Sequence, residues 1–278
     1  TLTGRFSYQN PNLQQIPARN KNLGPRIRAL FLPEEGHHWG CFDYNQQEPR
    51  LVVHYASLYK LPSVYGVVDS YWAAKKDNIK SDFHQTVADM AEIPRSQAKL
   101  INLGLFYGMG KGKLQAELGV TEEKAKELFD QYHAKVPFVK QLMEKASNRA
   151  QEQGQIRTLL GRLCRFPLWE PNSFGMHKAL SHEEALREHG PGIKRAYTYK
   201  SLNKLIQGSA ADMTKKSMLN LYKEGIVAHI QVHDELDISV ENDKQAERIV
   251  EIMEEAVTLE VPNKVDYECG KNWGDIYD

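Results

Sequence analysis

The sequence has little cysteine, no excess of charge of either sign and no long apolar run. Its three cysteines, Cys41, Cys164 and Cys269, are scattered without CxxC spacing, which argues against both a disulfide framework and a zinc site. Basic and acidic residues both number 36, so any basic surface for nucleic acid must be local. The absence of an apolar span or signal peptide predicts no membrane partner, and the cysteine usage predicts an intracellular, cytoplasmic location.

The 278 residues are enough for one large domain or two smaller ones, with ample apolar content for a core. The chain starts at Thr1 rather than at methionine, which we interpret as the mark of a fragment or a processed product. Alternating runs near both ends enclose a long helical stretch. This order predicts an α+β fold, in which a helical subdomain is inserted into an antiparallel sheet.

Local signals divide the chain into expected elements. Strands are expected at 28–32, 39–44, 155–160, 163–168, 230–240 and 264–268. Helices are expected at 49–59, around 71–72, and at 82–90, 94–108, 121–135, 137–154, 201–224 and 243–260. Residues 170–196 lack steady periodicity and are expected to form a surface insertion.

The segment 229–240 alternates between apolar and polar residues, which is typical of a half-buried strand. Asp234 lies on the apolar phase, between His233 and Glu235. A buried carboxylate needs a partner or a metal, because an isolated charge is costly to bury. The alternative is that two strands meet in a tight turn, with Asp234 as a solvated turn residue.

A second acid in a similar setting favours the metal interpretation. Asp43 ends the short aromatic run 39–44. The chain is expected to stay extended through Glu48 and to begin a helix with Pro49 in its first turn. Two strand-end carboxylates far apart in sequence suit a pair of Mg²⁺ ions, which prefer hard oxygen ligands and leave room for phosphate oxygens.

The helix expected at 94–108 presents cations on one face. Arg95 and Lys99 are four residues apart, and Leu103 and Tyr107 continue the same stripe. Such a face could bind a nucleotide, with its phosphates against the cations and its base against the apolar part. The alternative is an ordinary amphipathic helix with solvated cations. His84, on the preceding helix, is open to the same two interpretations.

Taken together, these residues resemble the motifs of the family A DNA polymerases, and most of all their phage versions. Residues 43–50 resemble the first palm motif of that family, 95–108 its fingers motif and 232–235 its last palm motif. Asn203 and the run 207–212 resemble the helix that approaches the primer-template. The resemblance runs from Thr3 to the C-terminus and is interrupted mainly at 170–196.

The resemblance implies a DNA-directed DNA polymerase that adds dNMP to a primer 3′-hydroxyl by two-metal-ion phosphoryl transfer. Asp43, Asp234 and the Tyr44 carbonyl would hold two Mg²⁺ ions, with Mn²⁺ as a substitute, and Glu235 would support them. The implied dNTP-binding residues are Gln46, Glu48, His84, Arg95, Lys99, Leu103 and Tyr107. The implied DNA-binding residues are Arg5, Asn12, Gln15, Arg19, Asn203, Gln207 and His233.

Some of these positions have more specific implied roles. Glu48 would crowd the sugar 2′ position and exclude ribonucleotides, and Tyr107 would stack near the templating position. Leu103 departs from the family, which usually has Phe or Tyr there, so altered discrimination against dideoxynucleotides is expected. Pro49 replaces the usual Leu, Gln47 an apolar residue, and Tyr199 an Arg that often precedes the Asn203 helix.

The expected architecture is a right-hand palm with inserted fingers. Residues 1–60 and 155–278 would form the palm, and 61–154, or as far as about 198, the fingers. No thumb or exonuclease is expected within the chain, so a separate N-terminal chain carrying them is the expected partner, beside primer-template DNA and dNTPs, in a phage-infected bacterium. The alternatives are a catalytically weak palm and fingers subunit that binds DNA, and a polymerase that copies or makes RNA.

Overall fold

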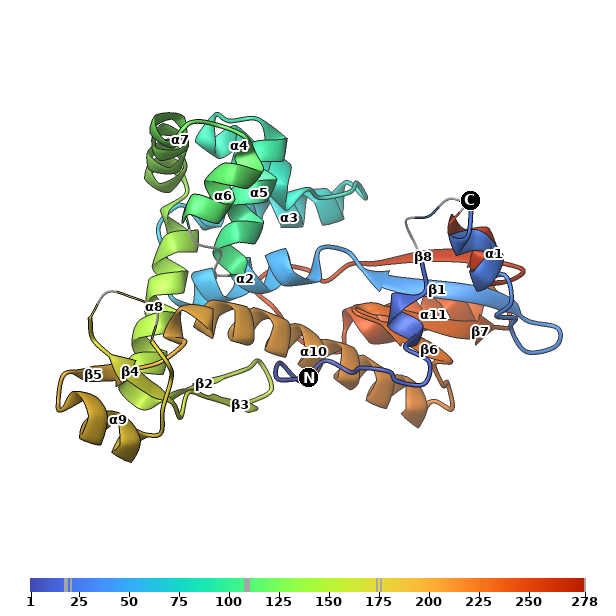
Figure 1. The fold of residues 1–278 in the computed structure, drawn as a ribbon. Helices are drawn as coiled ribbons and strands as arrows, with labels where there is room; N and C mark the ends of the chain where they lie inside the picture. The colour runs from blue at the N-terminus through green and yellow to red at the C-terminus, as the bar shows by residue number, and fades with distance from the viewer. Residues whose placement is uncertain (18–19, 21, 108–110, 174, 176, 278) are drawn as a thin grey trace. The chain divides into compact units, whose positions relative to one another are not determined.

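The computed structural model describes residues 1–17, 20, 22–107, 111–173, 175 and 177–277. The chain divides into two compact units (Figure 1), of which unit 1 comprises Thr1–Arg50 and Ala210–Asp278 and unit 2 comprises Leu51–Ser209. Helices accompany antiparallel strands in both units. The predicted α+β class is therefore confirmed.

Unit 1 is built on a four-stranded antiparallel sheet with the strand order β6-β7-β1-β8. The strands are β1 (His38–Tyr44), β6 (Ile230–Val232), β7 (Glu235–Val240) and β8 (Val265–Gly270). The helices are η1 (Leu13–Gln15), α1 (Gly24–Arg28), the first turn of α2 (Gln47–Leu58), the later part of α10 (Ser201–Lys223), α11 (Asp243–Glu254) and η3 (Trp273–Tyr277).

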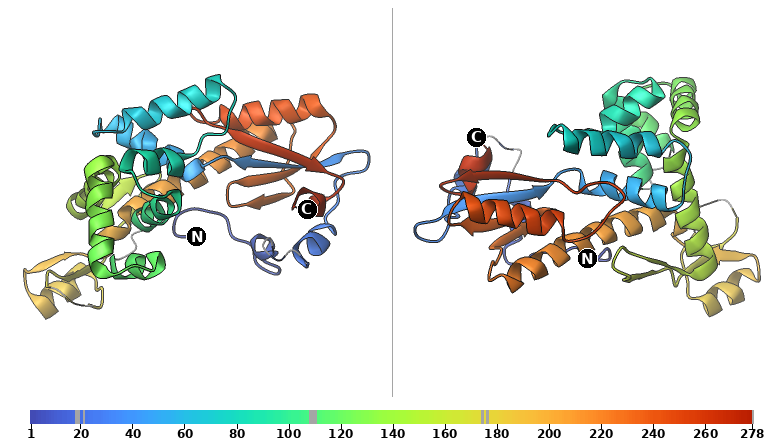
Figure 2. Two further views of the ribbon diagram at one scale, coloured as in Figure 1. Left: turned by 90° about the horizontal axis from the view of Figure 1, so that it is seen from above. Right: turned by 180° about the vertical axis from the view of Figure 1, so that it is seen from behind.

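The two faces of this sheet differ in what covers them (Figure 2, left). Helix α11 and the later part of α10 lie over one face, where the Tyr44 hydroxyl bonds Ser217 Oγ at 2.7 Å and the Met253 carbonyl at 2.5 Å. Helices α1 and η3 lie over the other face, where Trp39 stacks on Trp273 with ring centroids 6.1 Å apart. Asp43 lies on the same face as Trp39, because every second side chain along a strand points to the same face and the two residues are four positions apart.

Unit 2 is mainly helical. Its helices are the remainder of α2, α3 (Tyr65–Lys76), α4 (Phe83–Ala91), α5 (Arg95–Phe106), α6 (Lys111–Leu118), α7 (Glu122–Lys135), α8 (Pro137–Gln153), α9 (His182–His189), η2 (Thr198–Lys200) and the start of α10. Its strands pair as β2 (Gln155–Arg157) with β3 (Leu163–Arg165), and β4 (Trp169–Pro171) with β5 (Ile193–Arg195).

The predicted helices of the middle of the chain are confirmed, and their ends follow local chemistry. Asp82 and Thr121 accept hydrogen bonds from backbone N–H groups in the first turns of α4 and α7. Pro137 opens α8, and Gly154 closes it with a positive φ of 67°. The helix predicted at 94–108 is α5, which ends at Phe106; the predicted end itself, Gly108, lies outside the described residues.

Two predictions about the N-terminal region were wrong. Residues 28–32 form no strand; Pro25 instead opens the short helix α1, and its Arg28 guanidinium packs over the Trp273 ring at 4.3 Å. The chain is not extended through Glu48 either, since α2 begins at Gln47. Pro49 is tolerated there because the first turn of a helix needs no intrahelical N–H donor.

Further boundaries differ from the sequence predictions. The strands at 155–160 and 163–168 shorten to three residues each, and the helix at 243–260 ends at Glu254. The segment 170–196 contains the β4–β5 pair and α9, whose Ser181 and Glu184 form a capping box. Among the described helices, none is both long and apolar enough to span a membrane.

Candidate active site

The hairpin between β6 and β7 carries Asp234. Val232 pairs with Glu235, so His233 and Asp234 form a two-residue turn, in which His233 has a φ of 56°. The tight-turn alternative from the sequence is therefore correct about the backbone. Asp234 is nevertheless half-buried rather than solvated, so the turn does not remove its need for a partner.

Strand β1 brings a second acid to the same end of the sheet. Asp43 pairs with Glu235 on one side and with Asp266 on the other, and the Tyr44 N–H donates to the Asp234 carbonyl at 3.4 Å. Four acidic residues thus lie at one end of the sheet, three of them on the strands β1, β7 and β8 and Asp234 on the β6–β7 turn. Asp266 was missed by the sequence analysis, although the predicted strand at 264–268 contains it, because its importance depends on the register of β8.

Repulsion within this cluster shifts its ionisation. Desolvation, followed by the negative charge of Asp234 and Glu235, raises the pKa of Asp43 to about 8. Burial also raises the pKa of Asp234 to about 6, although the positive charge of Arg5 opposes the shift. Clustered carboxylates that repel one another form the hard oxygen donor set that Mg²⁺ prefers, so the residues present fit divalent metal ions.

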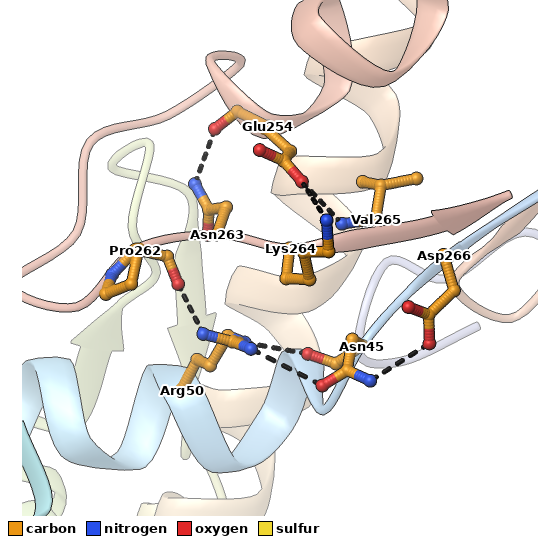
Figure 3. Close-up of polar contacts among 8 residues, drawn as sticks. All are labelled: Asn45, Arg50, Glu254, Pro262, Asn263, Lys264, Val265 and Asp266. Atoms are coloured by element: carbon orange, nitrogen blue, oxygen red, sulfur yellow. Dashed lines mark hydrogen bonds and ion pairs between the residues drawn. The ribbon is translucent and has the colours of Figure 1, made fainter. Parts of the chain in front are cut away.

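A buried arginine holds the chain segment that follows Asp43 (Figure 3). Arg50 donates from Nε to the Asn45 carbonyl at 2.7 Å and from a terminal nitrogen to the Pro262 carbonyl at 2.5 Å. Asn45 Nδ2 in turn donates to Asp266 Oδ2 at 3.0 Å. This network ties the start of α2 to β8 and orients one of the four acids. Sequence reasoning gave neither Arg50 nor Asn45 a role.

Glu48, on the first turn of α2, accepts a hydrogen bond at Oε1 from Arg5 Nη2 at 2.5 Å. Both side chains are largely buried, with 13% and 24% of their surfaces exposed. Gln46, just before the helix, has a positive φ of 54°. Three predicted site residues, Arg5, Gln46 and Glu48, thus lie in the same unit as the acid cluster.

The N-terminal segment of unit 1 contacts the hairpin. Asn12 caps η1 by accepting from the Gln14 N–H, and Gln14 Nε2 donates to the Gln231 side chain at 3.2 Å. Gln15 is exposed beside them, as is His233 on the turn. The predicted DNA-binding residue Arg19 lies outside the described residues.

In unit 2, the predicted phosphate-binding residues gather on α4 and α5. Arg95 and Lys99 are exposed on the first turns of α5. Arg95 Nε donates to Asp82 Oδ2 at 2.7 Å; partial burial opposes charge on Asp82, but this bond holds the pKa of Asp82 below its usual value. Leu103 is half-buried and Tyr107, just beyond the helix end, is exposed.

His84 belongs to a chain of side-chain hydrogen bonds that the sequence analysis missed. The Tyr132 hydroxyl donates to Asn102 Oδ1, which leaves Asn102 Nδ2 to donate to His84 Nδ1 at 3.1 Å. Nε2 of His84 therefore carries the ring proton. Burial, with Lys99 and Arg95 nearby and Asp82 opposing, lowers the pKa of His84 to about 4, so the ring is a neutral donor at pH 7.

The start of α10 carries two more predicted contacts. Asn203 and Gln207 are four residues apart and half-buried, so they share a helical face. The adjacent η2 exposes Tyr199, and Lys200 Nζ lies 5.5 Å from its ring centroid. Tyr199, with Lys200 beside its ring, thus stands where the resembled motif often has an arginine.

A family model described as DNA polymerase family A matches residues 1–275. This chain belongs to DNA polymerase family A. Members of that family generally use divalent metal ions, in agreement with the acid cluster of unit 1.

Among curated relatives, the chain is 37% identical to a DNA-directed DNA polymerase of Pseudomonas phage M6, over 98% of this chain and 43% of the relative. It is 34% identical to DNA polymerase I of Geobacillus stearothermophilus, over 99% of this chain and 30% of the relative. A solved structure, the POL domain of Pol1 from M. smegmatis in complex with DNA primer-template and dNTP, matches all of this chain and 47% of its own, with a TM-score of 0.78 at 29% identity. The chain thus spans less than half the length of these relatives.

Proposed function

We propose that the chain is the palm and fingers portion of a DNA-directed DNA polymerase that adds dNMP to a primer 3′-hydroxyl. The observation that carries this proposal is the convergence of Asp43, Asp234, Glu235 and Asp266 at one end of the unit 1 sheet, in a chain of this family. The named relatives are DNA polymerases, and the solved Pol1 structure holds primer-template and dNTP.

The carboxylates of Asp43 and Asp234, with the Tyr44 carbonyl, would hold two Mg²⁺ ions. When bound, such ions lower the pKa of the primer hydroxyl and neutralise the charge of the triphosphate. Glu235 supports the pair from the neighbouring register position. The Arg50 and Asn45 network keeps Asp266 in place, so the acids are positioned before substrate arrives.

The unit 2 residues would take the incoming triphosphate. Arg95 and Lys99 supply positive charge, and the neutral His84 ring donates from Nε2, so the three groups stabilise negative charge that grows on the phosphates. Leu103 would contact the sugar, and Tyr107 would stack beside the templating position. Glu48 and Gln46, on unit 1, would contact the sugar, with Glu48 excluding a 2′-hydroxyl.

We assign residues 1–60 and 155–278 to the palm and 61–154, or as far as about 198, to the fingers. The compact units divide after Arg50, close to the first of these boundaries, and after Ser209, which is closer to the alternative end of the fingers than to residue 154. The proposed primer-template contacts are Arg5, Asn12, Gln15, Arg19, Asn203, Gln207 and His233. Because the relatives are more than twice as long, we include in the working enzyme a thumb segment that lies outside the 278 residues. The phage relative supports action inside an infected bacterium.

Primer extension with Mg²⁺ and four dNTPs tests this function, with the chain alone and with a thumb-bearing N-terminal fragment of the phage relative. The expected result is template-dependent extension, in one or both mixtures, that the Asp234→Ala variant abolishes. Extension with ribonucleotides in preference would favour the RNA-making alternative. Equal activity of the Asp234→Ala variant, or DNA binding without any extension, would overturn the proposal and favour an assembly subunit.

A further inference from the structure

A second cluster, made of one cysteine and two acids, lies on the same sheet face as the candidate active site. Cys41 and Asp237 are direct partners across β1 and β7, two residues from the Asp43 and Glu235 pair. One ligand atom each from Cys41, Glu235 and Asp237 lies within 4.8 Å of the other two. We propose that these three side chains form a binding site for one thiophilic divalent cation of the Zn²⁺ class.

The burial of Asp237 points to a ligand. Asp237 is fully buried, with 0% of its surface exposed. Its Oδ1 accepts from Trp39 Nε1 at 3.1 Å and from Cys41 Sγ at 2.7 Å. Within the described part of the chain no donor group reaches its Oδ2, and the neighbour within hydrogen-bonding reach is another acid, Glu235. A buried carboxylate oxygen without a donor is costly.

The charges around the group have one sign. Two carboxylates, those of Glu235 and Asp237, lie beside the Cys41 sulfur with their ligand atoms within 4.8 Å of one another. Ionised groups of the same sign repel one another at such distances. A divalent ion neutralises this charge and also gives Asp237 Oδ2 a partner.

The donor set selects the class of ion. Zn²⁺ binds thiolate at about 2.3 Å and carboxylate oxygen at about 2.0–2.2 Å, so ligand atoms already within 4.8 Å of one another need only small movements to close on it. A sulfur ligand favours Zn²⁺ or Cd²⁺ over Mg²⁺. The Trp39 N–H fixes one oxygen of Asp237, as the hydrogen-bond donors behind metal-binding carboxylates commonly do.

This site differs from the candidate active site in its strand positions. Its ligands Cys41 and Asp237 are a cross-strand pair of β1 and β7. Only Glu235 also belongs to the other cluster, so this site does not require Asp43 or Asp234. Cysteine spacing argued against a zinc site because no two cysteines are close in sequence. The three ligands come from two strands separated by almost 200 residues, and only strand pairing brings them together.

The test is a Cd²⁺ titration of the metal-free full chain, followed by the ultraviolet charge-transfer absorbance of a cadmium thiolate. We expect one equivalent to bind and the absorbance to vanish in Cys41→Ser. Asp237→Asn should weaken binding by about tenfold or more, on the scale of losing a metal-site group. The exposed Cys269→Ser and the active-site Asp234→Asn should keep the absorbance, and their retention would separate this site from the surface thiol and from the Mg²⁺ cluster.

Zn²⁺ provides a second readout through thermal unfolding. Zn²⁺ should stabilise the wild-type chain and Cys269→Ser more than it stabilises Cys41→Ser and Asp237→Asn. A cadmium thiolate absorbance that persists in Cys41→Ser, or no stoichiometric binding by the folded wild-type chain, would overturn the proposal and leave a proton-sharing carboxyl pair. Circular dichroism of each variant shows whether a loss of binding reflects a loss of fold.

Discussion

Arg5 donates a hydrogen bond from its guanidinium to the Glu48 carboxylate, across 2.5 Å and 43 residues of sequence. The predicted primer-template contact, Arg5, and the residue predicted to exclude ribonucleotides, Glu48, are therefore directly hydrogen-bonded. The carboxylate is held in one orientation by a largely buried partner, which makes it a rigid obstacle rather than a mobile one.

Removing either side of this pair should relax sugar selection. We expect Glu48→Ala to raise ribonucleotide incorporation relative to deoxynucleotides by about tenfold or more, because a clash with a 2′-hydroxyl disappears. Arg5→Ala should produce a smaller change, since Glu48 remains but can move. Single-nucleotide incorporation assays measure the ratio, and the exposed Glu34→Ala is the matched control. An unchanged ratio in Glu48→Ala would remove it from sugar selection.

The acid cluster predicts opposite effects of Asp234→Asn on stability and on metal binding. Because the folded pKa values of Asp43 and Asp234 are raised, the protonated acids favour the folded state. This stability is lost as the pH rises, through about 6 for Asp234 and about 8 for Asp43.

At pH 8 without metal, Asp234→Asn should therefore be more stable than wild type by about 1 kcal/mol, after allowance for solvent screening. Mg²⁺ should stabilise the wild-type chain but not this variant. Thermal unfolding with and without Mg²⁺ measures both effects, and the exposed Glu247→Gln should behave as wild type. Equal stabilisation of Asp234→Asn by Mg²⁺ would place the ion elsewhere.

Arg50 should be sensitive even to lysine. Its guanidinium group donates to the carbonyls of Asn45 and Pro262 at the same time (Figure 3). The ammonium group of a lysine cannot reproduce that geometry. We expect Arg50→Lys to lower the free energy of unfolding by about 2 kcal/mol, because a buried carbonyl is left without its donor. Urea unfolding measures the change. The exposed Arg26→Lys should unfold like wild type, and a similar result for Arg50→Lys would show the network to be dispensable.

Local chemistry explains which elements were predictable from the sequence. The caps Asp82 and Thr121 lie within three residues of the N–H groups that they bind, so a short window contains the whole signal. The helix at Arg28 was missed because its arginine is buried against Trp273, 245 positions further along the chain. Such a contact leaves no mark on the neighbouring residues.

The candidate site was predictable only where its residues occur in recognisable motifs. Asp43 ended a short aromatic run, Asp234 lay on the apolar phase of an alternating run, and Arg95 and Lys99 were spaced by about one helical turn. Asp266 reaches the cluster through the register of β8 against β1, which alternation does not specify. Asn102 on α5 and Tyr132 on α7 are likewise joined by a side-chain hydrogen bond across 30 residues of sequence, so the tautomer of His84 could not be predicted.

His84 should make stability depend on pH in the acid range. Burial and nearby cations lower its folded pKa to about 4, against about 6.5 in the unfolded chain. The unfolded state therefore binds the proton more readily, and the stability contributed by the neutral ring is present above about pH 6.5 and lost as the pH falls towards 4. His84→Gln should flatten the unfolding profile in that window. The exposed His189→Gln should retain the wild-type slope; an identical slope in His84→Gln would contradict the neutral assignment.

Leu103 should control how the sugar of the incoming nucleotide is sensed. The half-buried leucine on α5 offers only an aliphatic contact, whereas a tyrosine in its place brings a hydroxyl that can substitute for the interactions of a missing 3′-hydroxyl. We expect Leu103→Tyr to raise dideoxynucleotide use relative to deoxynucleotide use by about tenfold, a change of the size that one polar contact produces. Competitive incorporation of the two nucleotides measures the ratio. Leu105→Tyr, on the same helix but a different face, is the control, and an equal ratio in wild type and Leu103→Tyr would remove position 103 from nucleotide selection.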